Sequence, residues 1–240
     1  MVEQSQRIYQ TLVNLENPNL STSILIGWIK ENSNVLDIGS GSGELGSYLH
    51  SNLNCRVTGI EMVAQQAALC SSYDRVVVGN IEQDNILEQV RAEYDYIILG
   101  DVLEHLVDPQ NLLLELKNFL ETPGYVLVSV PNVAYITNRL KLLCGRWNYK
   151  NGGVLDEGHL RFFTVKTIKE LFLVTGYQVE DSTANLSGSV WNVAAVQRFL
   201  TAIPGGYRFF RKNLLEPLST ILGYQLLFKI SKKESDMFGK

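Results

Sequence analysis

The fold of this chain is decided by residues 35–46, which read VLDIGSGSGELG. A short apolar run that contains one acid, Asp37, ends in closely spaced glycines, and an amphipathic segment begins at Glu44. This order is typical of a buried strand, a tight turn and the start of a helix. Glycines permit positive φ angles and let a ligand approach the main chain, and the free N–H groups at the helix start face that ligand. The stretch therefore predicts a ligand-binding turn.

Two kinds of ligand compete for this turn. Gly41, Gly43 and Gly46 fit the GxGxxG pattern of dinucleotide sites, which is weak evidence when it stands alone. In a site for NAD the strand runs into the first glycine of the motif. Here it runs into Gly39, which leaves Glu44 at the position of the third glycine. The carboxylate of Asp37 would also lie close to a pyrophosphate, whereas it suits a ligand that carries a positive charge.

The motif Asp-x-Gly-x-Gly-x-Gly behind a Val-Leu pair resembles motif I of the class I methyltransferases that depend on S-adenosylmethionine (SAM). The resemblance spans roughly residues 30 to 185. It implies SAM as the cofactor, with its ammonium and sulfonium charges near Asp37, and S-adenosylhomocysteine as the product. A structural glycine turn in another α/β domain is the alternative interpretation.

The resemblance also places the cofactor contacts at the ends of successive strands. Glu61 follows the second strand, where a carboxylate accepts both ribose hydroxyls; the alternative is a surface glutamate at the start of the next helix. Met62 would pack against the adenine. The expected cofactor-binding residues are Asp37, Gly39, Ser40, Gly41, Gly43, Glu61, Met62, Asn80, Ile81, Glu82, Gly100, Asp101, Val102 and His105.

Strands and helices alternate along the chain with connections of 10 to 20 residues. This alternation predicts an α/β fold with a mainly parallel sheet and helices on both faces. The resemblance implies a doubly wound, seven-stranded, Rossmann-like methyltransferase sheet with an antiparallel last strand. We expect strands at 35–38, 56–61, 75–78, 94–99, 125–130, 177–183 and 223–230. We expect helices at 44–50 and about 63–71, and others that start at Asp108-Pro109 and Thr164 and end at Pro123-Gly124 and Gly176.

The chain divides into an N-terminal segment and one large domain. Residues 1–33 are expected to form cap helices, one of them capped by Ser21–Ser23 and ending at Asn32; residues 34–240 form the methyltransferase domain. Two inserts interrupt this domain, a lid over the substrate at 131–163 after the fifth strand and a second insert at 185–222. Basic and aromatic residues mix within 196–212, which suits an exposed helix with a packed aromatic face, or a peripheral membrane or partner contact.

The exit of the fourth strand and the lid bear on the acceptor. The exit lacks the Asn/Asp-Pro-Pro-Tyr/Phe motif typical of methyltransferases that act on base or amide nitrogens, and its Glu104-His105-Leu106 resembles the O-methyltransferases of the ubiquinone pathway. The lid, with HLRFFT at 159–164 behind GRWNY at 145–149, resembles a bacterial branch akin to MetW-like and polysaccharide-locus enzymes, of the methyltransferase domain 23 type.

We expect His159 to act as a general base or substrate ligand, since histidine titrates near neutral pH. The alternative is a structural histidine that pins the lid. Arg146 and Arg161 could clamp an anionic acceptor, and a carboxylate acceptor would need no base. The expected substrate residues are Asn132, Arg146, Trp147, Tyr149 and Arg161.

Composition narrows the setting. The 240 residues are 45% hydrophobic and carry a net charge of −4, which gives no electrostatic case for a nucleic-acid partner. The three cysteines (Cys55, Cys70, Cys144) lack metal-binding spacing, so we expect no metal. No signal peptide or long apolar span is evident, so we expect a cytoplasmic protein.

The motifs and the resemblance together predict a SAM-dependent methyltransferase that O-methylates a small molecule, such as a sugar, a cell-envelope intermediate or a secondary metabolite. The alternatives are a non-catalytic SAM-binding regulatory module and an NAD-dependent oxidoreductase.

Overall fold

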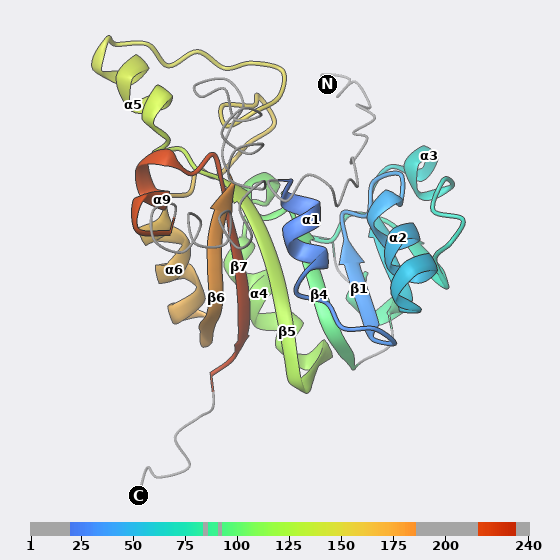
Figure 1. The fold of residues 1–240 in the computed structure, drawn as a ribbon. Coiled ribbons are helices and arrows are strands. Elements are labelled where there is room, and N and C mark those ends of the chain that lie inside the picture. Colours follow the sequence, from blue (N-terminus) through green and yellow to red (C-terminus); the bar gives the residue numbers. More distant parts are fainter. Residues whose placement is uncertain (1–19, 84–85, 91–92, 186–215, 234–240) are drawn as a thin grey trace, which may run out of the picture.

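The computed structural model describes residues 20–83, 86–90, 93–185 and 216–233 (Figure 1). Seven strands form one sheet in the order β3-β2-β1-β4-β5-β7-β6. Neighbouring strands are parallel except in the two pairs that contain β7. The predicted mainly parallel sheet with an antiparallel last strand is therefore confirmed. The strands are β1 Asn34–Ile38, β2 Arg56–Glu61, β3 Arg75–Val78, β4 Tyr94–Gly100, β5 Leu120–Pro131, β6 Tyr177–Asn185 and β7 Gln225–Lys232.

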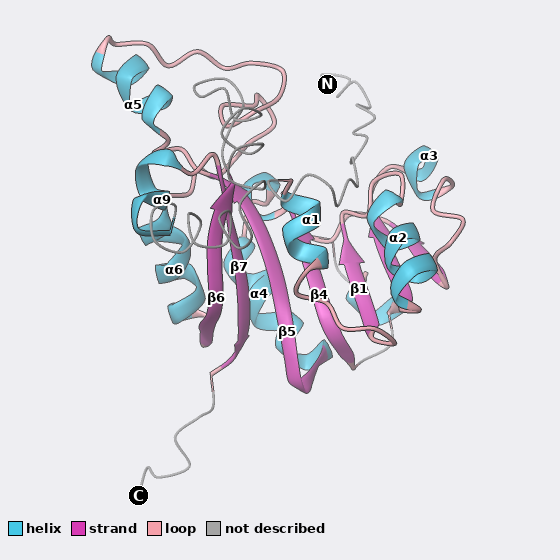
Figure 2. Ribbon diagram, viewed as in Figure 1, coloured by secondary structure: helices cyan, strands magenta, loops and turns pink. Residues whose placement is uncertain are grey.

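Helices cover both faces of this sheet (Figure 2). The α-helices are α1 Ser21–Ile26, α2 Glu44–Leu53, α3 Ala64–Ala67, α4 Pro109–Leu116, α5 Ile136–Leu143, α6 Val165–Val174 and α9 Glu216–Leu222; short 3-10 turns are η1 Leu87–Gln89, η2 Leu103–His105 and η3 Lys117–Phe119. Side chains alternate along β1, so that Leu36 and Ile38 pack with α4 and α6, while Val35 packs with α1 and α2. Burying one such side chain contributes about 1.5–3 kcal/mol.

Local sequence signals explain where two of the helices begin. The Asp108 carboxylate accepts a hydrogen bond of 3.0 Å from the Asn111 N–H, and Pro109 occupies the first turn of α4. Thr164 caps α6 through a reciprocal pair of hydrogen bonds with Thr167. Both starts agree with the prediction.

The end predicted for α4 is wrong. The helix stops at Leu116, the η3 turn follows, and β5 already begins at Leu120. Pro123-Gly124 therefore lies inside β5, where the pairing register with β4 shifts between Tyr94 and Tyr96. Such an irregularity accommodates a proline, which cannot donate to the ladder.

The start and end predicted for the N-terminal helix are also wrong. α1 has no side-chain cap and ends at Ile26, before Asn32. The Ser21 hydroxyl instead donates to the Gln225 side chain and accepts a hydrogen bond of 2.9 Å from the Asn185 amide. The hydroxyl that was expected to cap the helix therefore bonds side chains of β6 and β7. The helix predicted at 63–71 is likewise shorter, since α3 spans only Ala64–Ala67.

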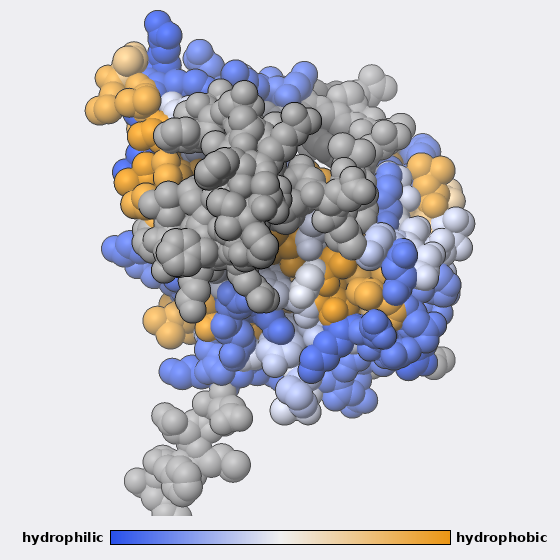
Figure 3. All heavy atoms as spheres, viewed as in Figure 1, coloured by the Kyte–Doolittle hydropathy of each residue, from blue (hydrophilic) through white to orange (hydrophobic). Residues whose placement is uncertain are grey.

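The insert at 131–163 is closed at its neck. The Val133 N–H donates to the Phe163 carbonyl at 2.9 Å, and Asn132 and Phe163 form an isolated bridge. Beyond the neck, α5 projects from the body of the molecule (Figure 1), and it leaves Leu140 55% and Leu143 82% exposed. Figure 3 shows a hydrophobic patch at the place of α5 in Figure 1. These leucines of α5 are thus turned outward.

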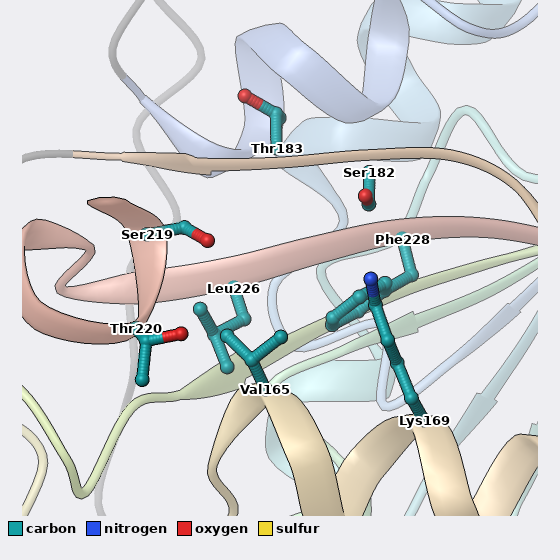
Figure 4. Close-up of a pocket in the computed structure, with 8 residues that line it drawn as sticks. All are labelled: Val165, Lys169, Ser182, Thr183, Ser219, Thr220, Leu226 and Phe228. Atoms are coloured by element: carbon teal, nitrogen blue, oxygen red, sulfur yellow. The ribbon is translucent and has the colours of Figure 1, made fainter. Parts of the chain in front are cut away.

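The far edge of the sheet holds a cavity of about 240 Å³ between α6, β6, β7 and α9 (Figure 4). It lies away from the glycine turn, since β5 and β4 separate β7 from β1 in the sheet.

No helix within the described ranges is both long and apolar enough to cross a membrane. The basic-aromatic segment 196–212, and most of 1–33, lie outside the described residues.

Candidate functional site

The glycine turn joins β1 to α2 at the end of the sheet where the parallel strands finish (Figure 1). Gly39, Gly41 and Gly43 have φ angles of 75°, 54° and 85°, so the expected left-handed backbone is present. The Gly39 N–H donates to the Ile60 carbonyl at 2.8 Å, which ties the turn to β2. A Cβ on Gly39 would lie 2.9 Å from Val102 Cγ2, so this glycine also lets the exit of β4 approach the turn.

Asp37 lies beneath the turn and is 4% exposed. Its Oδ2 accepts a hydrogen bond of 2.6 Å from the Tyr73 hydroxyl, and that hydroxyl accepts one of 3.1 Å from the Gly46 N–H. Tyr73 could not be predicted from the sequence, because it lies in a loop 36 positions away and no spacing pattern marks it. Gly46, which completes the GxGxxG pattern, is needed for packing: a Cβ there would lie 2.1 Å from Tyr73 Cζ.

Burial alters the chemistry of this acid. Desolvation raises the pKa of Asp37 to about 6, the Tyr73 hydrogen bond opposes that rise, and the negative charge of Glu61 adds to it. A positive charge placed beside Asp37 would restore the ionised form. The site can therefore favour a cationic ligand.

Glu61 holds the turn from the end of β2. Its Oε2 accepts from the Gly41 N–H and its Oε1 from the Val63 N–H, both at 2.8 Å. A carboxylate offers about four lone-pair positions, so two remain for further donors such as sugar hydroxyls. Met62 beside it is 59% exposed. This arrangement leaves room for the expected ribose contact, which stays a prediction.

The residues after β3 are tied to their own loop and to α4. Asn80 Oδ1 accepts from the Glu82 N–H at 3.0 Å, and Glu82 Oε1 accepts from the Asp108 N–H at 2.8 Å. Ile81 packs against the hydrophobic core. These bonds fix the exit of β3 beside the start of α4.

Asp101 follows β4 with a positive φ of 54°. Its Oδ1 accepts from the Ser129 hydroxyl at 3.0 Å and its Oδ2 from the Gln225 amide at 2.7 Å. Burial raises the pKa of Asp101, and these two hydrogen bonds oppose the rise. The last strand, β7, therefore supplies a donor to the exit of β4.

The far end of the insert folds over η2 through backbone hydrogen bonds. The N–H groups of Leu160 and Arg161 both donate to the Glu104 carbonyl, at 2.8 and 2.9 Å. His105 Nδ1 bonds the Gly158 carbonyl at 3.1 Å, and the rings of His105 and His159 meet edge to face with centroids 4.8 Å apart. Two histidines predicted separately thus lie together.

His159 is half-buried, and its Nδ1 bonds the Val154 carbonyl at 3.2 Å. Burial lowers the pKa of His159, which favours a neutral ring at neutral pH. A neutral imidazole can accept a proton or bind a cation. The fold therefore supports both the structural and the chemical interpretations of this residue.

The structure gives Asn132 a structural role in place of the predicted contact with substrate. The residue is 0% exposed, its amide nitrogen bonds three carbonyl oxygens of residues 219, 220 and 223, and its Oδ1 accepts from the Ala134 N–H. It fastens the insert to α9, because every polar atom of its side chain already has a partner. We assign it no contact with an acceptor.

The other expected substrate residues lie on the insert. The Arg161 guanidinium donates to the Val107 carbonyl, so part of it anchors the insert, and Arg146 is exposed. The rings of Trp147 and Tyr149 lie 5.5 and 6.4 Å from Phe162 and form an aromatic cluster with it. Contacts of these residues with an acceptor stay predictions.

Comparison with known proteins gives one family. A family model described as a methyltransferase domain matches residues 6–182. A ubiquinone biosynthesis O-methyltransferase of Glaesserella parasuis is 32% identical over 108 residues, and one of Leptothrix cholodnii is 29% identical over 104 residues. Each match covers 41% of this chain, and the chain spans less than half of those relatives' length, 45% and 44%.

A solved structure shares the fold. The plantazolicin methyltransferase BamL, in complex with a triazolic desmethylPZN analog and S-adenosylhomocysteine, superposes with a TM-score of 0.57 at 18% identity. The alignment covers 89% of this chain and 85% of that one. The likeness confirms the architecture around the glycine turn.

Proposed function

The chain belongs to the methyltransferase domain family, and we propose that it is a SAM-dependent enzyme that methylates an oxygen atom of a small molecule. One observation carries the choice of oxygen: the insert holds His159 against His105 at the exit of β4, next to the turn that approaches Val102. Imidazoles suit the removal of a hydroxyl proton. The curated relatives are named O-methyltransferases, which supports the same choice. A sugar, a cell-envelope intermediate or a secondary metabolite is the acceptor class that we favour.

The residues of the chain need not form a covalent bond with the acceptor or the cofactor. Bound SAM supplies an electrophilic methyl group. The glycine turn and Asp37 would orient the cofactor, and the insert would cover the acceptor and exclude water. With SAM bound, the C–S bond would break as the acceptor oxygen forms the C–O bond, and the acceptor's proton would pass to a neutral imidazole or to water. Orientation alone can lower the barrier by up to about 7–11 kcal/mol in ideal cases.

The proposal is tested with the purified chain, calorimetry and methyl-labelled SAM. We expect SAM to bind with one equivalent per chain, and label to pass to at least one compound in a panel of hydroxylated sugars, phenols and lipid-linked intermediates. SAM binding without turnover across the panel would favour a non-catalytic regulatory module. Retention of labelled NAD instead of SAM in ultrafiltration would favour an oxidoreductase.

Replacing His159 by alanine is expected to leave SAM affinity within about threefold and to lower turnover about 10²- to 10⁴-fold, the range typical of a lost proton-transfer group. The half-buried ring contacts the Val154 carbonyl of the insert and the His105 ring of η2. His50→Ala, which changes an exposed histidine of α2, is the matched control and should keep full turnover. Normal turnover by the His159 variant would refute this role.

The affinity for SAM is expected to rise with pH between about 5 and 6 and to level off above 6. The acid in question is Asp37, whose pKa burial raises from 3.8 to about 6. Below pH 6 the free protein holds this acid protonated, so binding a cation must displace a proton; affinity then changes up to about tenfold per pH unit. Calorimetry in buffers of different ionisation enthalpy measures both affinity and proton release. An affinity that is constant or falls across this range would contradict the expectation.

A further inference from the structure

We propose that Glu104, His105 and His159 bind one divalent transition-metal cation at the exit of β4. Each of the three side chains offers one ligand atom, and these atoms all lie within 4.8 Å of one another. Two imidazoles and a carboxylate are a donor set that divalent zinc, iron and related metals accept in proteins. Because 54 positions separate His105 from His159, the fold and not a sequence motif assembles the site.

The Glu104 carboxylate is the strongest sign of a ligand. It is 1% exposed, and neither of its side-chain oxygens has a hydrogen-bond partner among the described residues. Burying a carboxyl group without a partner is costly, and buried charges are normally paired or bound to metals. A cation between Glu104 and the two imidazoles would satisfy the carboxylate.

The hydrogen bonds of both histidines suit metal binding through Nε2. Nδ1 of His105 bonds the Gly158 carbonyl at 3.1 Å, and Nδ1 of His159 bonds the Val154 carbonyl at 3.2 Å. A carbonyl oxygen can only accept, so each Nδ1 carries the hydrogen and each Nε2 keeps its lone pair. A backbone carbonyl behind the ring is the usual support of a ligating histidine.

The scaffold around the cluster is held by main-chain hydrogen bonds. Leu160 and Arg161 donate to the Glu104 carbonyl, which fixes the insert against η2 without using any of the three side chains. Metal–ligand bonds of about 2.1 Å place ligand atoms about 3–4 Å apart, so small side-chain rotations would close the cluster on a cation. Three protein ligands leave further coordination positions open, as in catalytic metal sites.

The task of the cation follows from its place. A hydroxyl oxygen bound to a divalent metal loses its proton near neutral pH, as metal-bound water does. The proton would pass to water, and the bound oxygen would then form the C–O bond while the C–S bond of SAM breaks. This task rests on the proposed O-methylation, whereas the binding of the cation does not.

The site is tested on the full chain after chelator treatment and dialysis. Zn²⁺, Co²⁺ and Mn²⁺ are titrated separately by calorimetry, with Co²⁺ absorption and elemental analysis as spectroscopic and stoichiometric readouts. We expect about one cation per chain, and ligand-field bands of Co²⁺ that indicate nitrogen and oxygen ligands. Glu104→Gln and His159→Ala should each weaken the affinity at least about 100-fold.

Matched controls separate the cluster from nonspecific binding. Glu157→Gln, an exposed acid of the same insert, and His50→Ala should bind the cation as the wild-type chain does. Circular dichroism and SAM calorimetry check that each variant is folded; if Glu104→Gln is not, His105→Ala and His159→Ala decide. Binding of less than about 0.1 cation per chain at saturating metal, or unchanged affinity in folded variants, would overturn the proposal. Metal binding without turnover would leave the site standing and count against O-methylation. Turnover in the metal-free chain would support O-methylation and refute the task given to the cation.

Discussion

Replacing Asp37 by asparagine is expected to weaken SAM binding by at least about 100-fold, and Asp37→Ala should abolish it. Removing one member of a buried charge pair costs about 2–5 kcal/mol, and 100-fold corresponds to about 2.7 kcal/mol. Asp37 is 4% exposed, so little water is available to screen its charge. Asparagine keeps the size of the side chain and can still accept from Tyr73, so that the variant tests charge and not shape.

A variant of Tyr73, the hydrogen-bond partner of Asp37, distinguishes two explanations for a loss of SAM affinity. If Asp37 contacts the cofactor, Tyr73→Phe should keep SAM affinity within about fivefold when measured at pH 8, where Asp37 is ionised. If Asp37 serves only to hold the turn through the 2.6 Å bond to the Tyr73 hydroxyl, Tyr73→Phe should reproduce the full loss. Calorimetry of the three proteins decides between them. Equal losses in Asp37→Asn and Tyr73→Phe would refute direct charge recognition.

Gly46→Ala is expected to destabilise the fold by about 3 kcal/mol, from overpacking and the loss of a hydrogen bond. The new Cβ would lie 2.1 Å from Tyr73 Cζ. The ring has little freedom to move away. Its hydroxyl bonds Asp37, and its other edge lies so close to Gly59 that a Cβ built on that glycine would be 3.0 Å from Cδ1. For a chain of this length the melting temperature should fall by about 6–12 °C.

Urea unfolding measures this effect against a matched glycine. Gly27 has a φ of −62°, and an added Cβ would make only an ordinary contact of 3.4 Å with the Ile24 carbonyl oxygen. Gly27→Ala should therefore stay within about 0.5 kcal/mol of the wild-type chain. Combining Gly46→Ala with Tyr73→Ala should cost less than the sum of the two single changes, because the clash is removed. Full additivity would show that Tyr73 is not the cause.

Residue pattern predicted the sheet well where a polar residue or glycine ends an apolar run. β2 and β3 have the expected bounds, because Glu61 is the polar last residue of β2 and Gly79 directly follows the apolar residues of β3. The start of β5 could not be predicted in the same way. Leu120 continues the spacing of Leu116 along α4, so the helical period runs into the strand, and only pairing with Tyr94 settles the difference.

The candidate site shows the same division. Asp37, Glu61, Asp101 and His159 could each be found from a strand end or an unusual loop. What they touch could not, because the bonds of Leu160 and Arg161 to the Glu104 carbonyl involve main-chain atoms that no side-chain pattern reports. The sequence predicts no metal because its cysteines lack metal-binding spacing, whereas the Glu104 cluster draws on two distant segments.

The position of β7 has a consequence for the nascent chain. Residues 225–230 pair with residues 126–131, on the order of 100 positions earlier, and Gln225 brings the amide that holds Asp101. While the ribosome has yet to deliver this segment, β5 and β6 lack the strand that joins them, and the acid after β4 lacks one of its two side-chain donors. The hydrogen bond from Gln225 to Asp101 can therefore form only after the last strand has been synthesised.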